Sequence, residues 1–124
     1  MKNWVDKALL IHSLIIKQSG GNDLNVDIGK LESAIMSVFS TFDGKSLYDT
    51  KEQKAARLCY NIISSHPFTD GNKRIGVHLF LLFLKTEGIS VEYTDEELEC
   101  LGFGIAEGRL DYNYILNWIN QHKK

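Results

Sequence analysis

The apolar residues of this chain recur at three- and four-residue spacing along most of its length, which is the pattern of amphipathic helices. Such stripes occupy residues 4–18, the segment after the potential N-cap Asp27, the segment after Thr50, and residues 111–121. The segment 75–84 is apolar nearly all round, and a helix of that kind is normally buried at the middle of a bundle. A buried strand is the alternative for this segment, but it contains more Leu and Phe than β-branched residues, which favours a helix.

The starts of two expected helices carry capping-box patterns, in which a Thr is followed three residues later by Gln or Glu. These pairs are Thr50 with Gln53 and Thr94 with Glu97. Neither an internal repeat nor a linker divides the chain. We therefore expect a single all-α domain over residues 1–124, built as a bundle of about six helices.

One connection, at residues 41–49, does not have the helical pattern. Asp43 and Gly44 stand between apolar residues there, which is typical of a tight β-hairpin turn. An ordinary loop between two helices fits the same spacing equally well, so both interpretations stay open from the spacing alone.

Composition excludes several classes of protein. Fourteen Lys and Arg against sixteen Asp and Glu give a formal net charge of -2, so there is no general attraction for nucleic acid or for anionic membranes. No apolar run reaches the roughly 18 residues of a membrane span, and no basic segment precedes a signal-peptide core. Cys59 and Cys100 stand far apart without a CxxC pair, which gives no disulfide framework and no zinc knuckle. We expect a cytoplasmic protein.

Residues 66–74, His-Pro-Phe-Thr-Asp-Gly-Asn-Lys-Arg, gather groups that suit phosphate chemistry. Pro67 disfavours the α conformation at His66, so a helix should end near Ser65 and His66 should lie at the mouth of a loop. With an ordinary pKa near 6.5, a histidine there can accept a proton from an attacking hydroxyl. Phe68 is interpreted as the side chain that fixes the loop to the core.

The second half of this motif predicts an anion site at the start of the next helix. Asp70 or Asn72 can cap that helix, and a helix N-terminus attracts anions. Gly71 lets the backbone approach a phosphate, and Lys73 and Arg74 add two cations. Asp70 also offers the hard oxygen that Mg²⁺ takes when it shares a site with substrate phosphates. Each group alone has an ordinary structural explanation, but the combination favours phosphoryl or nucleotidyl transfer.

These nine residues match the pattern HxFx(D/E)GN(G/K)R at every specified position, and the chain therefore resembles the Fic/Doc (Fido) superfamily. The similarity is strongest to the death-on-curing (Doc) toxins of toxin–antitoxin systems and extends over nearly the whole chain. The further similar segments are 31–34, 42–48, 93–97 and 106–109.

The resemblance implies a Fic/Doc-type helical bundle and a role for each motif residue. His66 would be the base that deprotonates a target hydroxyl, and Asp70 would help to hold Mg²⁺. The nucleotide phosphates would be bound by a set of motif residues: Phe68, Gly71, Asn72, Lys73 and Arg74. The segment 41–49 corresponds to the flap that holds the target in extended form beside the active site. The flap residues are Phe42, Gly44, Lys45, Leu47 and Tyr48.

Lys73 is the position that separates the reactions of this superfamily. Fic proteins that transfer AMP usually carry Gly there, whereas Doc toxins carry Lys, which implies transfer of the γ-phosphate of ATP. For Doc toxins the implied target is a threonine of elongation factor Tu, and its modification halts translation. One departure is Gly71, where the Doc prototype has Ala. The alternatives are a Fic-type AMP transferase and a non-catalytic binding module with the same fold.

An inhibitory helix with the pattern [S/T]xxxE[G/N] is common in Fic proteins and is absent from this sequence. Only Glu87-Gly88 and Glu107-Gly108 provide the Glu-Gly end, and Phe83 and Phe103 occupy the required Ser/Thr positions. The resemblance therefore implies inhibition by a separate antitoxin protein.

Overall fold

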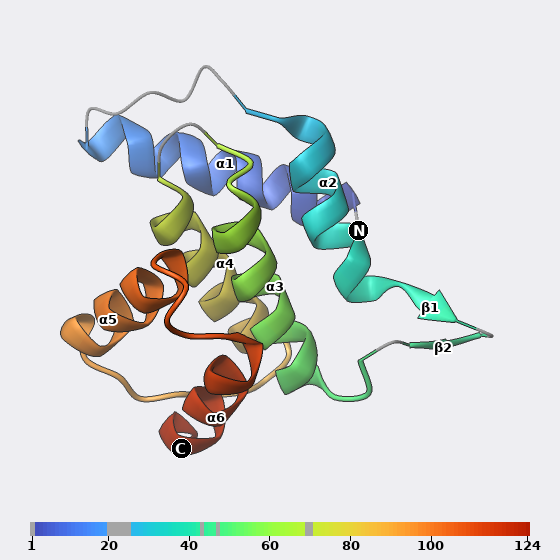
Figure 1. The fold of residues 1–124 in the computed structure, drawn as a ribbon, viewed down its shortest axis with the longest axis vertical. Coiled ribbons are helices and arrows are strands. Elements are labelled where there is room, and N and C mark those ends of the chain that lie inside the picture. The colour runs from blue at the N-terminus through green and yellow to red at the C-terminus, as the bar shows by residue number, and fades with distance from the viewer. Residues whose placement is uncertain (1, 20–25, 43, 47, 69–70) are drawn as a thin grey trace.

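The computed structural model describes residues 2–19, 26–42, 44–46, 48–68 and 71–124, and these ranges form a bundle of six α-helices (Figure 1). The helices are α1 (Lys2–Ser19), α2 (Ile28–Met36), α3 (Lys51–Ser65), α4 (Asn72–Thr86), α5 (Asp95–Ala106) and α6 (Tyr112–His122). A 3-10 turn, Ser37–Phe39, extends α2, and two short strands, β1 (Thr41–Phe42) and β2 (Lys45–Ser46), follow it. The prediction of an all-α bundle of about six helices is confirmed.

Helix α4 forms the centre of the bundle, as its apolar sequence predicts. Its side chains at Ile75, Leu79, Phe80 and Leu84 are fully buried, and α3, α1 and α5 pack against it. Gly76 permits the close approach of α3, since a Cβ there would lie 2.4 Å from the Cγ1 atom of Ile63. The first turn of α4, which follows directly on the motif loop, is thus fixed to the best-packed part of the molecule.

The helix starts follow the predicted capping chemistry. Thr50 accepts a hydrogen bond from the backbone N–H of Gln53, whose side chain accepts from the backbone of Thr50, and Thr94 and Glu97 repeat this arrangement at α5. The Asp27 side chain accepts from the N–H of Lys30 and caps α2. Each cap satisfies backbone donors that a helix N-terminus leaves unpaired. None of the helices in the described ranges is long and apolar enough to cross a membrane.

Strands β1 and β2 form an antiparallel hairpin, which decides between the two interpretations of residues 41–49. Thr41 pairs with Ser46 and Phe42 with Lys45, and Gly44 in the turn has a φ of +77°. Figure 1 shows the hairpin projecting from the bundle near the start of α3. His66 follows the last residue of α3, so the hairpin and His66 lie at opposite ends of this helix.

Candidate active site

His66 stands at the C-terminal end of α3 with an exposed side chain. Its backbone is in the left-handed region, with φ 50° and ψ 59°, and no other non-glycine residue in the described ranges has a positive φ. Pro67 disfavours continuation of the helix at His66, and a left-handed residue is a common way for an α-helix to end. The chain turns away from α3 at this point, and the imidazole faces solvent at the mouth of the loop.

The loop after His66 is fixed to the segment before α2 and to α1. The N–H of Asp27 donates to the carbonyl of Pro67 at 2.7 Å, and Val26 and Phe68 form an isolated antiparallel bridge. The Phe68 ring is 4% exposed and stacks on His12 of α1, with ring centroids 3.7 Å apart and planes inclined by 15°. Phe68 therefore holds the loop to the core, as predicted. Because its ring is buried, it contributes to the site by fixing the position of the loop.

Asn72 closes the loop, and the prediction that its side chain caps α4 is wrong. Its Nδ2 donates to the carbonyl of Phe68 at 2.8 Å, and its Oδ1 accepts from the N–H of Phe68 at 3.0 Å. Gly71 is the N-cap, without a side-chain hydrogen bond, and Asn72 is the first helical residue. A carboxamide carries a donor and an acceptor side by side, so it can bind both backbone groups of one residue. The alternative cap, Asp70, lies outside the described residues.

Gly71 is required by conformation and by space. Its φ of +83° is in the left-handed region, which residues with a side chain rarely adopt. A Cβ there would lie 3.2 Å from the Cδ1 of Ile16 and 3.4 Å from the Nε2 of His12. The start of α4 is therefore pressed against α1, and the backbone at this turn carries no side chain that could obstruct an anion.

The two cations of the motif, Lys73 and Arg74, lie exposed on the first turn of α4. Neither forms an ion pair with an acidic residue of the described ranges, so their charge adds to the positive end of the helix dipole. The Nζ of Lys73 lies 4.9 Å from the ring centroid of Phe103 on α5. Partial desolvation, and then the charge of Arg74, lower the pKa of His78 one turn further along α4. The start of α4 is thus suited to phosphate groups.

The predicted metal ligand, Asp70, is not among the described residues. Within the described ranges, no three His, Cys, Asp or Glu side chains gather closely enough to hold a metal ion. Mg²⁺ is commonly held by one or two carboxylates together with substrate phosphates, so the predicted site does not need such a cluster.

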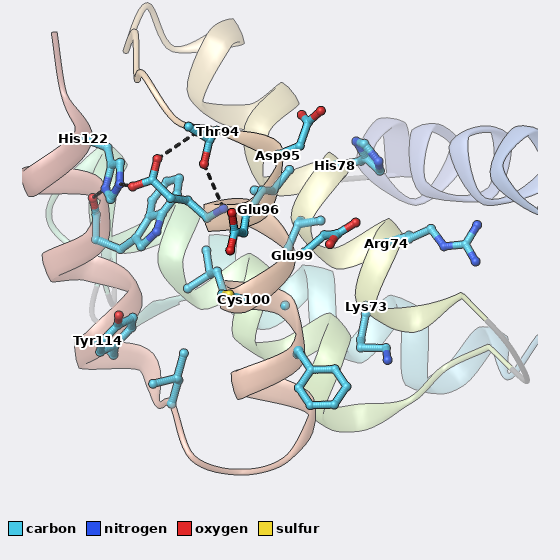
Figure 2. A pocket seen from close by; sticks show the side chains of 18 of the residues that line it. Lys73, Arg74, His78, Thr94, Asp95, Glu96, Glu99, Cys100, Tyr114 and His122 are labelled. Carbon is cyan, nitrogen blue, oxygen red and sulfur yellow. Dashed lines mark hydrogen bonds and ion pairs between the residues drawn. The ribbon is translucent and has the colours of Figure 1, made fainter.

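A pocket of about 1160 Å³ adjoins the two cations and lies between α4, α5 and α6. Figure 2 shows Lys73 and Arg74 at one side of it and Thr94 and His122 at the other. His122 closes the far side, where its Nε2 lies 2.8 Å from the Oε2 of Glu97 and its Nδ1 lies 2.8 Å from the carbonyl of Trp118. The contact with Glu97 raises the pKa of His122, and the same contact lowers the pKa of Glu97.

Four of the five predicted flap residues are among the described residues: Phe42, Gly44, Lys45 and Tyr48. Gly44 and Lys45 are exposed in the hairpin, and Leu47 lies outside the described residues. Phe42 pairs through its backbone with Lys45. Because α3 has 15 residues, its two ends lie about 22 Å apart at the usual helical rise. The hairpin lies near the start of α3 and His66 follows its end (Figure 1), and the role of these residues as a target-binding flap stays a prediction.

Tyr48 shows how the hairpin is attached to the bundle. Its ring centroid lies 6.2 Å from that of Tyr112 on α6, and the Arg57 guanidinium of α3 lies 5.4 Å from Tyr48 and 4.1 Å from Tyr112. Tyr60 borders the same guanidinium at 5.8 Å. The Nε of Arg57 is buried without a hydrogen-bond partner in the described ranges. These contacts fix the base of the hairpin to α3 and α6.

Sequence patterns missed two supporting residues. His12 packs against the motif loop, and Arg57 holds the base of the hairpin. His12 is 2% exposed and belongs to the apolar stripe of α1. A single histidine in such a stripe does not by itself indicate a functional site. Its position within that stripe was the available signal, because a buried polar residue generally has a specific partner. Tyr60 lies three residues after Arg57 on the same helix and was the available signal, whereas Tyr48 and Tyr112 belong to other segments.

Comparison with known proteins identifies the class. The sequence model of the Fic/DOC family matches residues 5–84, which is more than half of the chain, and the protein therefore belongs to this family. Among curated proteins, the chain is similar to the one named Protein kinase doc from Escherichia phage P1. The two are 27% identical over 116 residues, which cover 94% of this chain and 90% of the phage protein.

Proposed function

We propose that this protein is a Doc-like toxin that transfers the γ-phosphate of ATP to a threonine or serine hydroxyl of a target protein. The observation that carries the proposal is the similarity to Protein kinase doc over nearly the full length of both chains. Lys73 supports the same reaction, because a lysine at this motif position resembles the Doc toxins rather than the AMP-transferring Fic proteins. The proposed target is elongation factor Tu, whose modification would halt translation.

His66 is the proposed general base. Its Nε2 or Nδ1 would take the proton from the target hydroxyl while the hydroxyl oxygen attacks the γ-phosphorus. The bond from the γ-phosphorus to the bridging oxygen breaks, and ADP leaves with that electron pair. The exposed position of His66 at the end of α3 supports this role, because a protein hydroxyl can approach the imidazole from solvent.

The start of α4 is the proposed phosphate site. Lys73 and Arg74 lie on its first turn, and Gly71 leaves the backbone there without a side chain. Two cations and a helix N-terminus would neutralise the charge that develops on the transferred phosphate and on ADP. Mg²⁺, held by Asp70 and by phosphate oxygens, would supply further charge neutralisation. Asn72 would act by holding the loop that carries these groups.

The hairpin is the proposed docking element for the target chain. Its two short strands leave an edge to which an extended segment could add by backbone hydrogen bonds. A segment bound there would run along α3 toward His66, and a helix of 15 residues is about 22 Å long, which corresponds to about seven extended residues.

Inhibition by a separate antitoxin protein is also proposed. The two Glu-Gly pairs that could end an internal inhibitory motif are the C-terminal caps of α4 and α5, with Gly88 and Gly108 at positive φ. Phe83, in the position that needs Ser or Thr in the first pair, is buried in the core. These features support inhibition in trans.

The position of the label in ATP tests the proposed reaction. Purified elongation factor Tu is incubated with the protein, Mg²⁺ and ATP labelled at either the γ- or the α-phosphate. We expect the target to take up the γ label only. Uptake of the α label would assign the protein to the AMP transferases, and tight ATP binding without transfer to any bacterial protein would favour a binding module.

A further inference from the structure

We propose that Phe103 of α5 is a positioning residue that orients the ammonium group of Lys73 toward the phosphates of a bound nucleotide. The inference rests on the proposed function of the α4 start as a phosphate site. Phe103 lies outside the HxFx(D/E)GN(G/K)R motif, and its exposed side chain is not part of the hydrophobic core.

The packing of α5 on α4 brings Phe103 to Lys73. Gly102, directly before it, lies so close to α4 that a Cβ there would be 3.3 Å from the Cγ1 of Val77 and 3.8 Å from the Cβ of Lys73. The glycine therefore fixes the separation of the two helices at this turn. The Lys73 Nζ then lies 4.9 Å from the centroid of the Phe103 ring, within the range of a cation–π interaction.

The exposure of Phe103 indicates that its ring does not serve the core. It is 51% exposed, whereas Leu101 and Ile105 on the same helix are buried. An exposed aromatic ring is unremarkable alone. Here, however, one face of the ring is occupied by the ammonium of a residue that the motif places at the phosphate site.

The chemistry of this contact suits a phosphate ligand. The N-terminal half of α5 is rich in carboxylates, including Asp95, Glu96 and Glu99, which line the same pocket. A carboxylate partner would orient Lys73 but would also neutralise it. The ring of Phe103 attracts the ammonium without removing its charge, and Lys73 has no acidic partner within the described ranges. The lysine is thus oriented without an acidic partner that would offset its charge.

Orientation matters because a lysine side chain has four rotatable bonds and loses conformational freedom when it binds an anion. A cation–π contact at an exposed site contributes about 0.5–1 kcal/mol, which corresponds to roughly a two- to fivefold change in an equilibrium constant. Loss of the ring should therefore weaken binding of MgATP by that factor.

Calorimetric titration of MgATP into the full-length protein tests the inference. Phe103→Leu should raise the dissociation constant about two- to fivefold, and Phe103→Trp should keep it near the wild-type value, because Trp is the strongest cation–π partner. In a Lys73→Met background, the same Phe103→Leu change should have no further effect. An equal loss in both backgrounds would overturn the inference, because the ring would then act through packing alone. Tighter or unchanged binding in the single variant would also overturn it.

Tyr93→Leu is the matched control. Tyr93 is a partly exposed aromatic just before α5, and it contacts Trp118 rather than Lys73, so its replacement should leave the dissociation constant unchanged. Failure of the wild-type protein to bind MgATP would overturn the proposed function together with this inference. Normal binding and transfer by the wild type, with no change in Phe103→Leu, would overturn the role of Phe103 alone.

Discussion

Replacement of Asn72 by Ala separates two roles that this side chain could have. In the structure it makes two hydrogen bonds to the backbone of Phe68, at 2.8 and 3.0 Å, in a partly buried setting. A typical hydrogen bond contributes about 0.5–1.5 kcal/mol to stability, so loss of both should destabilise the closed loop by about 1–3 kcal/mol. Because a factor of ten corresponds to about 1.4 kcal/mol, protection of the Phe68 amide from hydrogen exchange should fall roughly 5- to 150-fold.

Native-state hydrogen exchange followed by NMR measures this protection directly. Thr86→Ala is the control, because it removes a side-chain hydrogen bond to the carbonyl of Leu82 at the other end of α4 and should not affect Phe68. ATP binding by Asn72→Ala should weaken in parallel with the loss of protection. Unchanged protection at Phe68, combined with weaker ATP binding, would refute loop closure as the role of Asn72 and favour direct contact with phosphate.

Three further changes test the site and its support. His66→Ala should slow transfer about 10²–10⁴-fold with no drop in Tm, because the side chain is exposed; normal turnover would remove it from the mechanism. Gly76→Ala should destabilise the protein by about 1–3 kcal/mol through the contact of its Cβ with Ile63, and a raised Tm in thermal denaturation would contradict this packing. The contact between His122 and Glu97 should stabilise the fold most between pH 4.5 and 6.5, their ordinary pKa values. Its contribution should fade as the pH rises through the raised pKa of His122 or falls through the lowered pKa of Glu97. His122→Gln should abolish the high-pH part in melting curves, while the hydrogen bonds of Glu97 with Thr94 keep some of the low-pH part.

The features that the sequence predicted correctly are those whose cause lies within a few residues. The capping boxes at Thr50 and Thr94 join residues three apart, and both form as predicted. Pro67 acts on its immediate neighbour, and α3 ends at Ser65. Local patterns of this kind are visible without knowledge of the tertiary structure. At residues 41–49 the local pattern left a hairpin and an ordinary loop equally open, and only the structure shows the hairpin.

The features that the sequence did not predict depend on contacts between distant segments. The ring of Phe68 stacks on His12 of α1, and Arg57 of α3 contacts Tyr48 and Tyr112 from two other segments. The Asn72 side chain is able either to cap a helix or to bind the backbone of a neighbouring loop. Because Gly71 is the N-cap of α4, Asn72 takes the second role. The separation of the hairpin from His66 follows from the path of α3 through the bundle, which no short motif encodes.

The central claim is that the γ-phosphate of ATP is transferred to a hydroxyl of the target. Mass spectrometry of elongation factor Tu after incubation with the protein, MgATP and no other kinase tests it most directly. We expect the target to gain the mass of one phosphate on a threonine or serine, and His66→Ala to give at most about a hundredth of this product in the same time. A gain of the mass of AMP would contradict the account.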